Sequence, residues 1–463
     1  MKYLVLIMLT TYVSVLKAQV ELVFGDSLVG EKGIVSQQLP DGTIWTVGMT
    51  QSGPNGGNDL LAVRLDTTGN FLTPIQYYGT AALDYPNNMI YQDGKLIVVG
   101  ERHDNGNVDG FIMQMDTTGV VQTYLHYGQP NETEQFYDIK ATQDGGFVVT
   151  GFGASPTATA NNFLLSKFDA SGQQEWMKTY DWGTNEVGVA VVETPDGGFL
   201  IAGDQLQFSG NYNVLVAKCD SVGNLLWQKS VYSPYNGGCK QMVATNDQVV
   251  IVGEMATATS FSFDVYMIRM DWNGNVLFQQ TIPKTNSGDA AFDVFVQDEN
   301  TIYVTGYLFD GPTSNTNLFV MALDSAGQIL DEKQYGAHNF DMGYDIKLLS
   351  NNKFMITGFT SRPNNQVYVI LDELSPITAV NAPLLSTEKF APIYPNPTVA
   401  SIYIPTALQG YTVRVSSMLG EILIEQENVS DQLMVKILSK GIYAVAFYDV
   451  HGRLVEQQWL VRE

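Results

Sequence analysis

Short apolar runs recur along most of the chain with a period of about 52 residues. One kind of run ends in a glycine seven times, at Gly48, Gly100, Gly151, Gly203, Gly253, Gly306 and Gly358. A second kind ends in an aspartate seven times, at Asp66, Asp116, Asp169, Asp220, Asp271, Asp324 and Asp372. Self-similarity at a fixed period is typical of a repeat architecture, so the pattern predicts seven copies of one unit.

Each unit contains four short segments with the alternation of β-strands. In the fourth unit these are residues 189–194, 198–203, 214–219 and 225–230. Asp-Gly joins the first two strands in several units, which favours a tight hairpin. Asp-x-x-Gly joins the last two strands in six units, which is the residue order of a type I turn. We therefore assign the repeated aspartates to turns, because a calcium loop needs more oxygen ligands within one segment.

Seven four-stranded units predict a closed ring. A twisted four-stranded sheet buries both faces only against neighbouring copies, as in a β-propeller. The seventh unit ends at Asp372 without a fourth strand, whereas Val20–Phe24 precedes the first unit as an unassigned strand. Docking Val20–Phe24 as the outer strand of the last unit closes the ring and removes an open edge. The predicted fold class is all-β, with a seven-bladed β-propeller; an open solenoid is the alternative.

The units resemble bacterial propeller repeats of the delta-60 type. The resemblance rests on residues 93–100, Asp-Gly-Lys-Leu-Ile-Val-Val-Gly, followed by Asp109–Asp116. It implies a scaffold and no particular activity, because propellers carry many unrelated functions.

A second β-rich module follows a linker at residues 376–390. Its landmarks are Tyr394, Pro395, Asn396, Pro397, Gly420, Gly441, Tyr443 and Gly452. In order and spacing they closely resemble the type A sorting domain of the Bacteroidota type IX secretion system. The resemblance implies a small β-sandwich, recognition by the type IX machinery and export across the outer membrane, followed by surface attachment or release. A β-sandwich that itself binds a ligand is the alternative.

The N-terminus has the pattern of a signal peptide. Lys2 precedes an apolar stretch over residues 3–15, and Ala18 suits a cleavage position. The stretch is too short for a membrane span, and no later segment approaches that length. The expected domains are a signal peptide at 1–18, a propeller at 19–375, a linker at 376–390 and a sorting domain at 391–463.

Composition narrows the possible partners and cofactors. The formal charge of −24 makes nucleic acids and anionic membrane surfaces unfavourable partners. Cys219 and Cys239 permit one disulfide, but Cys219 aligns with apolar core positions of other repeats. The four histidines share no metal-ligand spacing, and no nucleophile elbow or phosphate loop is present. We therefore expect no metal, no cofactor and no catalytic constellation.

The longer connections, after the second and fourth strands, are expected on one rim of the ring. Variable loops on a rigid scaffold commonly carry binding, and aromatic faces beside carboxylates suit sugar rings. The candidate ligand-binding residues are Tyr78, Tyr127, Trp182, Glu186, Tyr335, His338 and Asp341. For each aromatic, packing between blades is the competing interpretation.

These patterns suggest a secreted or cell-surface binding or adhesion protein that holds a glycan or a protein partner at one propeller rim. The alternative is a secreted polysaccharide-degrading enzyme with carboxylates in the propeller funnel. A purely structural role in adhesion is a third hypothesis.

Overall fold

The protein is described by a computed structural model with two compact units, Met1–Leu374 and Ser375–Glu463. The described residues are 19–25, 29–129, 132–154, 160–207, 210–231, 236–256, 263–282, 288–298, 300–310, 315–336, 340–361, 365–373, 398, 400–417, 422–448 and 454–462. The predicted signal peptide, His338 and most of the sorting-domain landmarks lie outside them.

The described strands of the first unit form seven four-stranded sheets, numbered here 1 to 7 in chain order. Their bounds are, for sheet 1, β2 (Glu31–Gln38), β3 (Ile44–Thr50), β4 (Asp59–Leu65) and β5 (Gln76–Tyr78); for sheet 2, β6 (Leu83–Gln92), β7 (Lys95–Asp104), β8 (Asn107–Asp116) and β9 (Val121–Tyr127); for sheet 3, β10 (Thr133–Ala141), β11 (Phe147–Ala154), β12 (Asn162–Phe168) and β13 (Gln174–Tyr180); for sheet 4, β14 (Glu186–Glu193), β15 (Phe199–Leu206), β16 (Tyr212–Cys219) and β17 (Leu225–Val231); for sheet 5, β18 (Gly237–Ala244), β19 (Gln248–Ala256), β20 (Phe263–Asp271) and β21 (Val276–Ile282); for sheet 6, β22 (Asp289–Asp298), β23 (Thr301–Asp310), β24 (Asn315–Leu323) and β25 (Ile329–Tyr335); and for sheet 7, β26 (Asp341–Leu348), β27 (Lys353–Thr360), β28 (Gln366–Glu373) and β1 (Val20–Phe24). One parallel residue pair, Thr133 with Val108, also links sheets 2 and 3.

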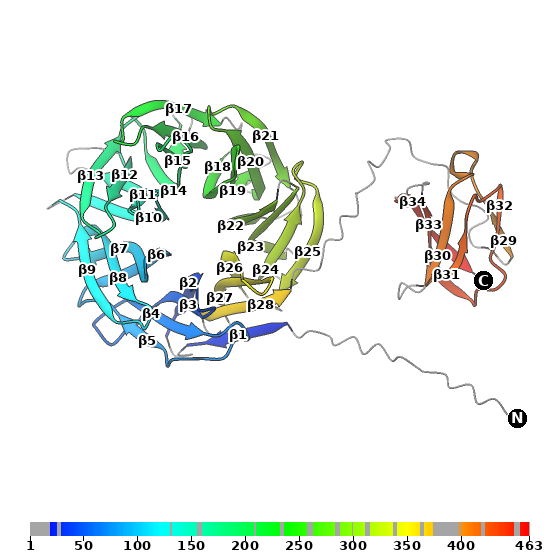
Figure 1. Cartoon of the computed structure of the whole chain (residues 1–463), viewed down its shortest axis with the longest axis horizontal. Helices are drawn as coiled ribbons and strands as arrows, with labels where there is room; N and C mark the ends of the chain where they lie inside the picture. The colour runs from blue at the N-terminus through cyan, green and yellow to red at the C-terminus, as the bar shows by residue number, and fades with distance from the viewer. Residues whose placement is uncertain are drawn as a thin grey trace, which may run out of the picture. The chain divides into compact units, whose positions relative to one another are not determined.

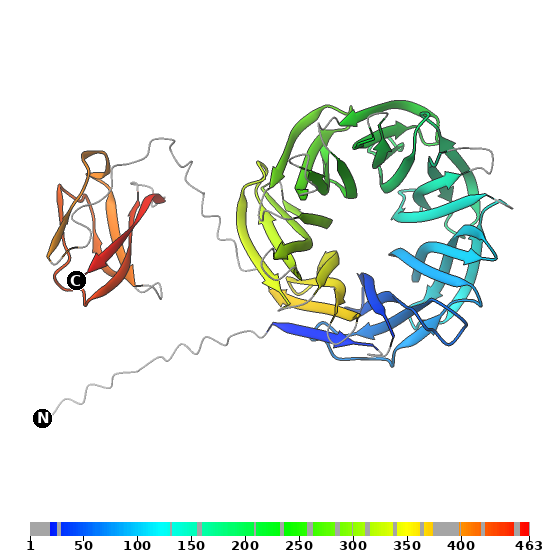
Figure 2. The same cartoon turned by 180° about the vertical axis from the view of Figure 1, so that it is seen from behind.

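The sheets follow one another around a central opening, with the first strand of each sheet innermost (Figures 1 and 2). Strand β2 of sheet 1 contacts β26, β27 and β28 of sheet 7, so the first and last repeats are neighbours. The all-β class and the propeller-like arrangement predicted from the repeats are confirmed.

Strand β1 is the outer strand of sheet 7, the position expected for Val20–Phe24. It pairs antiparallel with β28, from Val20 opposite Leu371 to Phe24 opposite Val367. The Phe24 ring is buried and meets the edge of Phe71 at 5.2 Å between centroids. The N-terminal strand therefore joins the two ends of the repeat array.

The apolar core lies between neighbouring sheets. One buried cluster joins Val214 of sheet 4 to Met242 of sheet 5, and another joins Leu61 of sheet 1 to Val369 of sheet 7. Cys219 and Cys239 are both buried and unbridged, so Cys219 is a core residue as predicted. Each sheet thus buries its faces against its neighbours and depends on them for stability.

The turns between third and fourth strands use the repeated aspartates as predicted. In sheet 1 the Asp66 carboxylate accepts hydrogen bonds from the backbone N–H of Thr68 and Asn70, at 2.8 and 2.9 Å. Burial opposes ionisation, but the hydrogen bonds from the side chains and backbone of Thr68 and Asn70 together lower the pKa of Asp66 to about 2. Gly69 closes the turn at φ +89°, a conformation that favours glycine.

A β-bulge interrupts every innermost strand at the same place. The register shifts lie between Gly33 and Val35, Pro86 and Asn88, Phe136 and Asp138, Gly188 and Ala190, Cys239 and Gln241, Ala291 and Asp293, and Gly343 and Asp345. The bulge breaks the apolar alternation of the innermost strand. For sheet 4 the alternation therefore predicts a first strand that starts at Val189, whereas β14 starts at Glu186.

The bulge also explains the repeated glycines. A Cβ on Gly48 would lie 2.0 Å from the carbonyl oxygen of Lys32, and one on Gly358 would lie 1.8 Å from that of Met342. The same clash occurs at the other five repeat glycines. The glycine therefore recurs because the bulged strand brings its backbone too close for any side chain.

The described residues of the second unit form two sheets around an apolar cluster of their own. Strands β29 (Ser401–Tyr403) and β32 (Gln432–Met434) form the smaller sheet. The larger sheet has the order β31 (Ile422–Gln426), β30 (Thr412–Ser417), β33 (Gly441–Tyr448) and β34 (Leu454–Arg462), and a short 3₁₀ helix spans Thr406–Leu408. Both sheets contribute to the core, and the buried Tyr443 donates its hydroxyl to the carbonyl of Ser439 at 2.8 Å.

Candidate functional site

The seven bulged residues line one cavity. Its volume is about 470 Å³, and its walls come from the innermost strands of all seven sheets. The bulged residues in this wall are Ile34, Asn87, Tyr137, Val189, Lys240, Phe292 and Tyr344. A β-bulge re-aims a side chain, so the fold turns one residue per repeat toward the centre of the ring.

An aromatic arc occupies the part of the wall that belongs to sheets 6 and 7. Phe292 lies 5.2 Å from Tyr344 between ring centroids, and 5.8 Å from Tyr307. Tyr344 stacks on Phe359 at 5.8 Å with an interplanar angle of 24°. Tyr344 and Phe292 are half-buried and line the cavity, whereas Tyr307 and Phe359 contact them without being part of its wall.

Lysines stand at both ends of this aromatic arc. On the sheet 5 side, the Lys240 ammonium lies 5.9 Å from the Phe292 centroid and forms an ion pair with Glu254 at 3.0 Å. Although burial favours the neutral amine, Glu254 raises the pKa of Lys240 above its ordinary value. On the sheet 1 side, the Lys32 ammonium lies 5.0 Å from the Phe359 centroid. Both cations are positioned over aromatic faces, which attract them electrostatically.

Carboxylates around the cavity connect neighbouring sheets. Asp204 accepts the backbone N–H of Cys239 at 2.7 Å, Asp293 accepts that of Ile346 at 2.8 Å, and Asp345 accepts that of Ser36 at 3.0 Å. The last bond joins sheet 7 to sheet 1. Burial raises the pKa of Asp204 to about 6. These three carboxylates therefore stabilise the contacts between neighbouring sheets.

A second set of polar side chains lies on sheet 2, outside the lining of the cavity. The Glu101 carboxylate lies 3.5 Å from His103 Nε2, and the Tyr85 ring meets the His103 ring at 5.1 Å. Burial raises the pKa of Glu101. Tyr137 packs against Phe152 at 6.0 Å on the neighbouring sheet.

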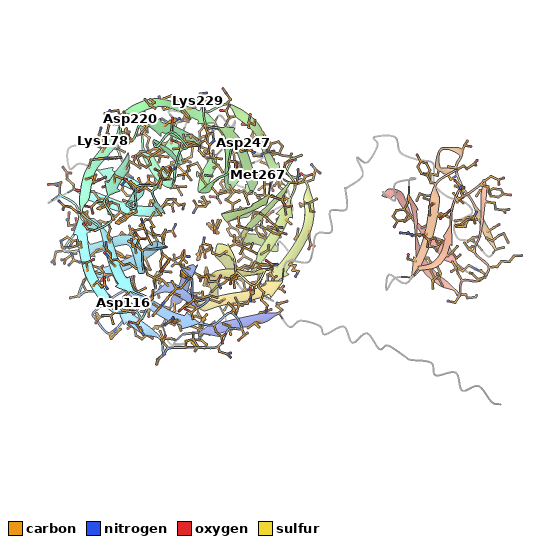
Figure 3. The ribbon with its side chains drawn as sticks, in the orientation of Figure 1. Asp116, Lys178, Asp220, Lys229, Asp247 and Met267 are labelled. Carbon is orange, nitrogen blue, oxygen red and sulfur yellow. The ribbon has the colours of Figure 1, made fainter. Side chains whose placement is uncertain are left out.

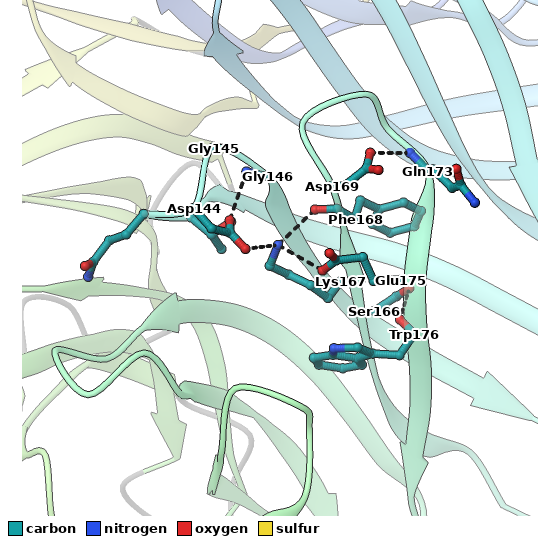
Figure 4. Close-up of polar contacts among 12 residues, drawn as sticks. Asp144, Gly145, Gly146, Ser166, Lys167, Phe168, Asp169, Gln173, Glu175 and Trp176 are labelled. Carbon is teal, nitrogen blue, oxygen red and sulfur yellow. Dashed lines mark hydrogen bonds and ion pairs between the residues drawn. The ribbon is translucent and has the colours of Figure 1, made fainter.

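These side chains lie at the end of the ring that carries the longer connections. The residues that precede each bulge follow the loop from the previous sheet, and their partners on the second strand lead into the next long loop. At the other end, short turns are held by ion pairs. Lys167 is buried and bridges Asp144 and Glu175 at 2.8 and 3.3 Å (Figure 4).

Three of the candidate tyrosines fasten one sheet to the next. The Tyr78 hydroxyl donates to the carbonyl of Gly119 at 2.8 Å, and that of Tyr127 donates to the carbonyl of Gly172 at 3.3 Å. The Tyr335 hydroxyl donates to the carboxylate of Asp372 at 2.8 Å. In each case the acceptor belongs to the turn region of the following sheet.

The other candidates lie near the loops but not together. Trp182 is half-buried, stacks on Tyr180 at 6.0 Å and meets Phe163 edge-on at 5.3 Å. Glu186 is fully buried and accepts the backbone N–H of Thr184 at 3.1 Å. Asp341, also fully buried, occupies the equivalent position in sheet 7. The assignment of these residues to ligand binding stays a prediction.

Sequence reasoning missed the residues of the cavity wall, although one signal was present. The position 13 or 14 residues before each repeat glycine is occupied by Ile34, Asn87, Tyr137, Val189, Lys240, Phe292 and Tyr344. Core positions of the repeat are apolar, whereas this position changes chemistry from copy to copy. Such variation within a regular repeat marks side chains that are not needed for packing.

Within the described residues, no group of three or more His, Cys, Asp or Glu side chains has the arrangement of a metal site. No helix in that part of the chain is long and apolar enough to cross a membrane.

The C-terminal module belongs to a recognised sorting-domain type. Residues 392–458 match the family described as a secretion system C-terminal sorting domain. The expectation of a type IX sorting domain is therefore confirmed, and the protein is secreted or displayed at the cell surface. No curated protein sequence matches this chain.

Solved structures with a similar fold are β-propellers. An ulvan lyase whose structure holds -[GlcA(1-4)Rha3S]- is 11% identical, with a TM-score of 0.50 over 74% of this chain and 91% of the lyase. The WD40 domain of Pan2 from Neurospora crassa is also 11% identical, with a TM-score of 0.48 over 74% of this chain and 90% of that domain. At this identity the likeness to the lyase shows the fold alone.

Proposed function

We propose that this is an exported carbohydrate-binding protein that holds its ligand in the central cavity of the ring and does not cleave it. The observation that carries the proposal is the ring of seven bulged residues. Identical backbone positions present aromatic, amide, ammonium and aliphatic side chains to one cavity of about 470 Å³. That volume is within the range of small-molecule sites, and its lining combines polar groups with apolar and aromatic side chains.

The side chains in the cavity suit sugars. Half-buried rings such as Tyr344 and Phe292 offer flat faces to the C–H side of a pyranose. Asn87 and Gln241 in the same wall offer amide donors and acceptors for hydroxyl groups. The sorting domain supports an extracellular location, where glycans are abundant.

The hydrogen bonds accepted by the carboxylates of the cavity wall favour binding over hydrolysis. A glycosidase needs two carboxyl groups free to act as acid and as base or nucleophile. Asp204, Asp293 and Asp345 instead accept backbone N–H groups of the neighbouring sheet.

A glycan array followed by calorimetry on soluble polysaccharides tests the proposal on the purified protein. We expect at least one saturable glycan ligand, and Tyr344→Ala is expected to weaken it about tenfold, because truncating a central aromatic anchor costs more than about 1 kcal/mol. Tyr212→Ala, on the exposed face of β16, is the matched control and is expected to bind normally.

Two results would contradict the proposal. Binding that survives both Tyr344→Ala and Tyr137→Ala would place the ligand outside the cavity. Release of new sugar ends from any bound polysaccharide would show an enzyme.

A further inference from the structure

One lysine beside the cavity has no anionic partner among the residues that the structure describes. Lys32 lies on the innermost strand of sheet 1, is half-buried and has its ammonium over the Phe359 ring. Neither an ion pair nor a hydrogen bond joins its side chain to another residue that the structure describes.

Other lysines on the innermost strands are neutralised locally. Lys140 pairs with Asp138 at 2.7 Å, Lys240 with Glu254 at 3.0 Å, and Lys347 with Asp345 at 2.6 Å. Lys32 therefore differs from its counterparts in having three N–H donors that no described carboxylate uses.

Lys32 is continuous with the aromatic arc. Its ammonium contacts Phe359, Phe359 stacks on Tyr344, and Tyr344 lines the cavity beside Phe292. A sugar ring lying on Tyr344 would bring its substituents to the sheet 1 side, where the unpaired ammonium lies. The three carboxylates in the cavity wall are already bound to backbone N–H groups of the neighbouring sheets.

We propose that the ligand of this cavity is an anionic sugar whose ring lies on Tyr344 and whose carboxylate or sulfate group reaches Lys32, two residues before Ile34 of the cavity wall. This inference rests on the proposed function and adds the charge class of the ligand. A single ammonium in an acidic protein suits one anionic substituent per sugar, whereas a polyphosphate would need several cations.

Calorimetry with matched pairs of polysaccharides tests the inference. The probes are polygalacturonate and alginate, each with its carboxyl-reduced form, and chondroitin sulfate with its desulfated form. We expect at least one charged probe to bind, and its neutral or desulfated counterpart to bind about tenfold more weakly, as expected for losing one charge-assisted contact. Which member of the set binds distinguishes a carboxylate from a sulfate ligand.

Three variants assign the effect to Lys32. Lys32→Gln is expected to weaken the charged probe about tenfold and to leave its neutral counterpart unchanged, whereas Lys32→Arg keeps the affinity within about threefold. Lys229→Gln is the matched control, because Lys229 also lies over an aromatic ring, at 5.5 Å from Trp227, but on the outer strand β17 (Figure 3). That variant is expected to bind as the wild type does.

Each failure has its own meaning. Equal binding of charged and neutral probes, or wild-type affinity in a folded Lys32→Gln protein, would overturn the anionic-ligand inference and leave carbohydrate binding standing. Absence of binding to every probe, charged or neutral, and to the glycan array would overturn the proposed function itself.

Discussion

Tyrosines at the ends of four outer strands connect a sheet to the next one. The Tyr180 hydroxyl donates to the carbonyl of Gly223 at 2.7 Å, and the same contact recurs from Tyr78 and Tyr127. A buried hydroxyl without a partner is costly, so the tyrosine and its acceptor fix the distance between sheets. At the residue scale these aromatics hold the ring together, while the bulged residues are the ones that face the cavity.

Tyr335→Phe tests this structural role. The variant loses a buried hydrogen bond to the Asp372 carboxylate, so the free energy of unfolding is expected to fall by about 1.5 kcal/mol. Tyr212→Phe, whose side chain is 40% exposed, is the control and is expected to change little. Chemical denaturation measures both, and an unchanged stability with lost glycan binding would instead support the rim as the ligand site.

Asp204 is expected to make stability depend on pH. Burial raises its pKa from 3.8 to about 6 in the folded protein. The folded state therefore binds this proton more tightly than the unfolded state does. Its favourable contribution is fully present below about pH 4 and is lost as the pH rises through about 6.

Asp204→Asn removes this titration and keeps an oxygen that can accept the Cys239 N–H. Relative to the wild type, the variant is expected to gain about 1 kcal/mol at about pH 8 and nothing at about pH 4. Denaturation curves across this range provide the measurement, with the exposed Asp247→Asn as the control (Figure 3). A parallel loss of stability in wild type and Asp204→Asn would contradict the assignment.

At the element scale, the bulges allow the innermost strands both to pack between sheets and to line the cavity. In sheet 6, Ala291 and Val294 pack in the core between sheets, and the bulged Phe292 faces the cavity. The repeat glycine opposite the bulge makes this possible, because its missing Cβ leaves room for the carbonyl of the bulged strand. The element therefore allows ligand-facing residues to vary without disturbing the core.

Removal of β1 tests the contribution of an outer strand. A chain that starts after Phe24 leaves the edge of β28 unpaired and exposes apolar surface that Phe24 covers. We expect a loss of at least about 2 kcal/mol of stability, the order of one buried aromatic side chain. Exposed edges pair with other chains, so self-association is also expected. Calorimetry and light scattering compare this protein with one that starts at Gln19, and equal behaviour would show that β1 is dispensable.

At the scale of the whole molecule, contacts between the first and the last repeat close the ring. Ser36 N–H donates to Asp345, and Glu31 N–H donates to the carbonyl of Asn365 at 2.9 Å. These partners are more than 300 residues apart in the sequence, as the 309-residue separation of Ser36 and Asp345 shows. The cavity exists only because closure brings sheets 1 and 7 together. The sorting unit has its own core and carries the export signal independently.

The strands, the turns and the sorting module could be predicted from the sequence because their signals are local. Asp66 and Gly69 specify a turn within four residues, and the repeat glycines recur at a spacing that needs no knowledge of packing. The candidate site could be predicted only as positions beside the longer connections, and it stays a prediction. Tyr335, Glu186 and Asp341 flank such connections in the sequence, whereas their burial follows from contacts with other sheets.

Local chemistry alone therefore determined the repeat, its four strands, its turns and the closing strand at Val20–Phe24, since each depends on residues a few positions apart. The cavity wall depended on packing. Lys32, Phe292 and Tyr344 are hundreds of residues apart or on different sheets, and no pattern in one repeat shows that they share a surface. These side chains come to share one surface only when the bulges have turned residues of the innermost strands inward and the ring has closed.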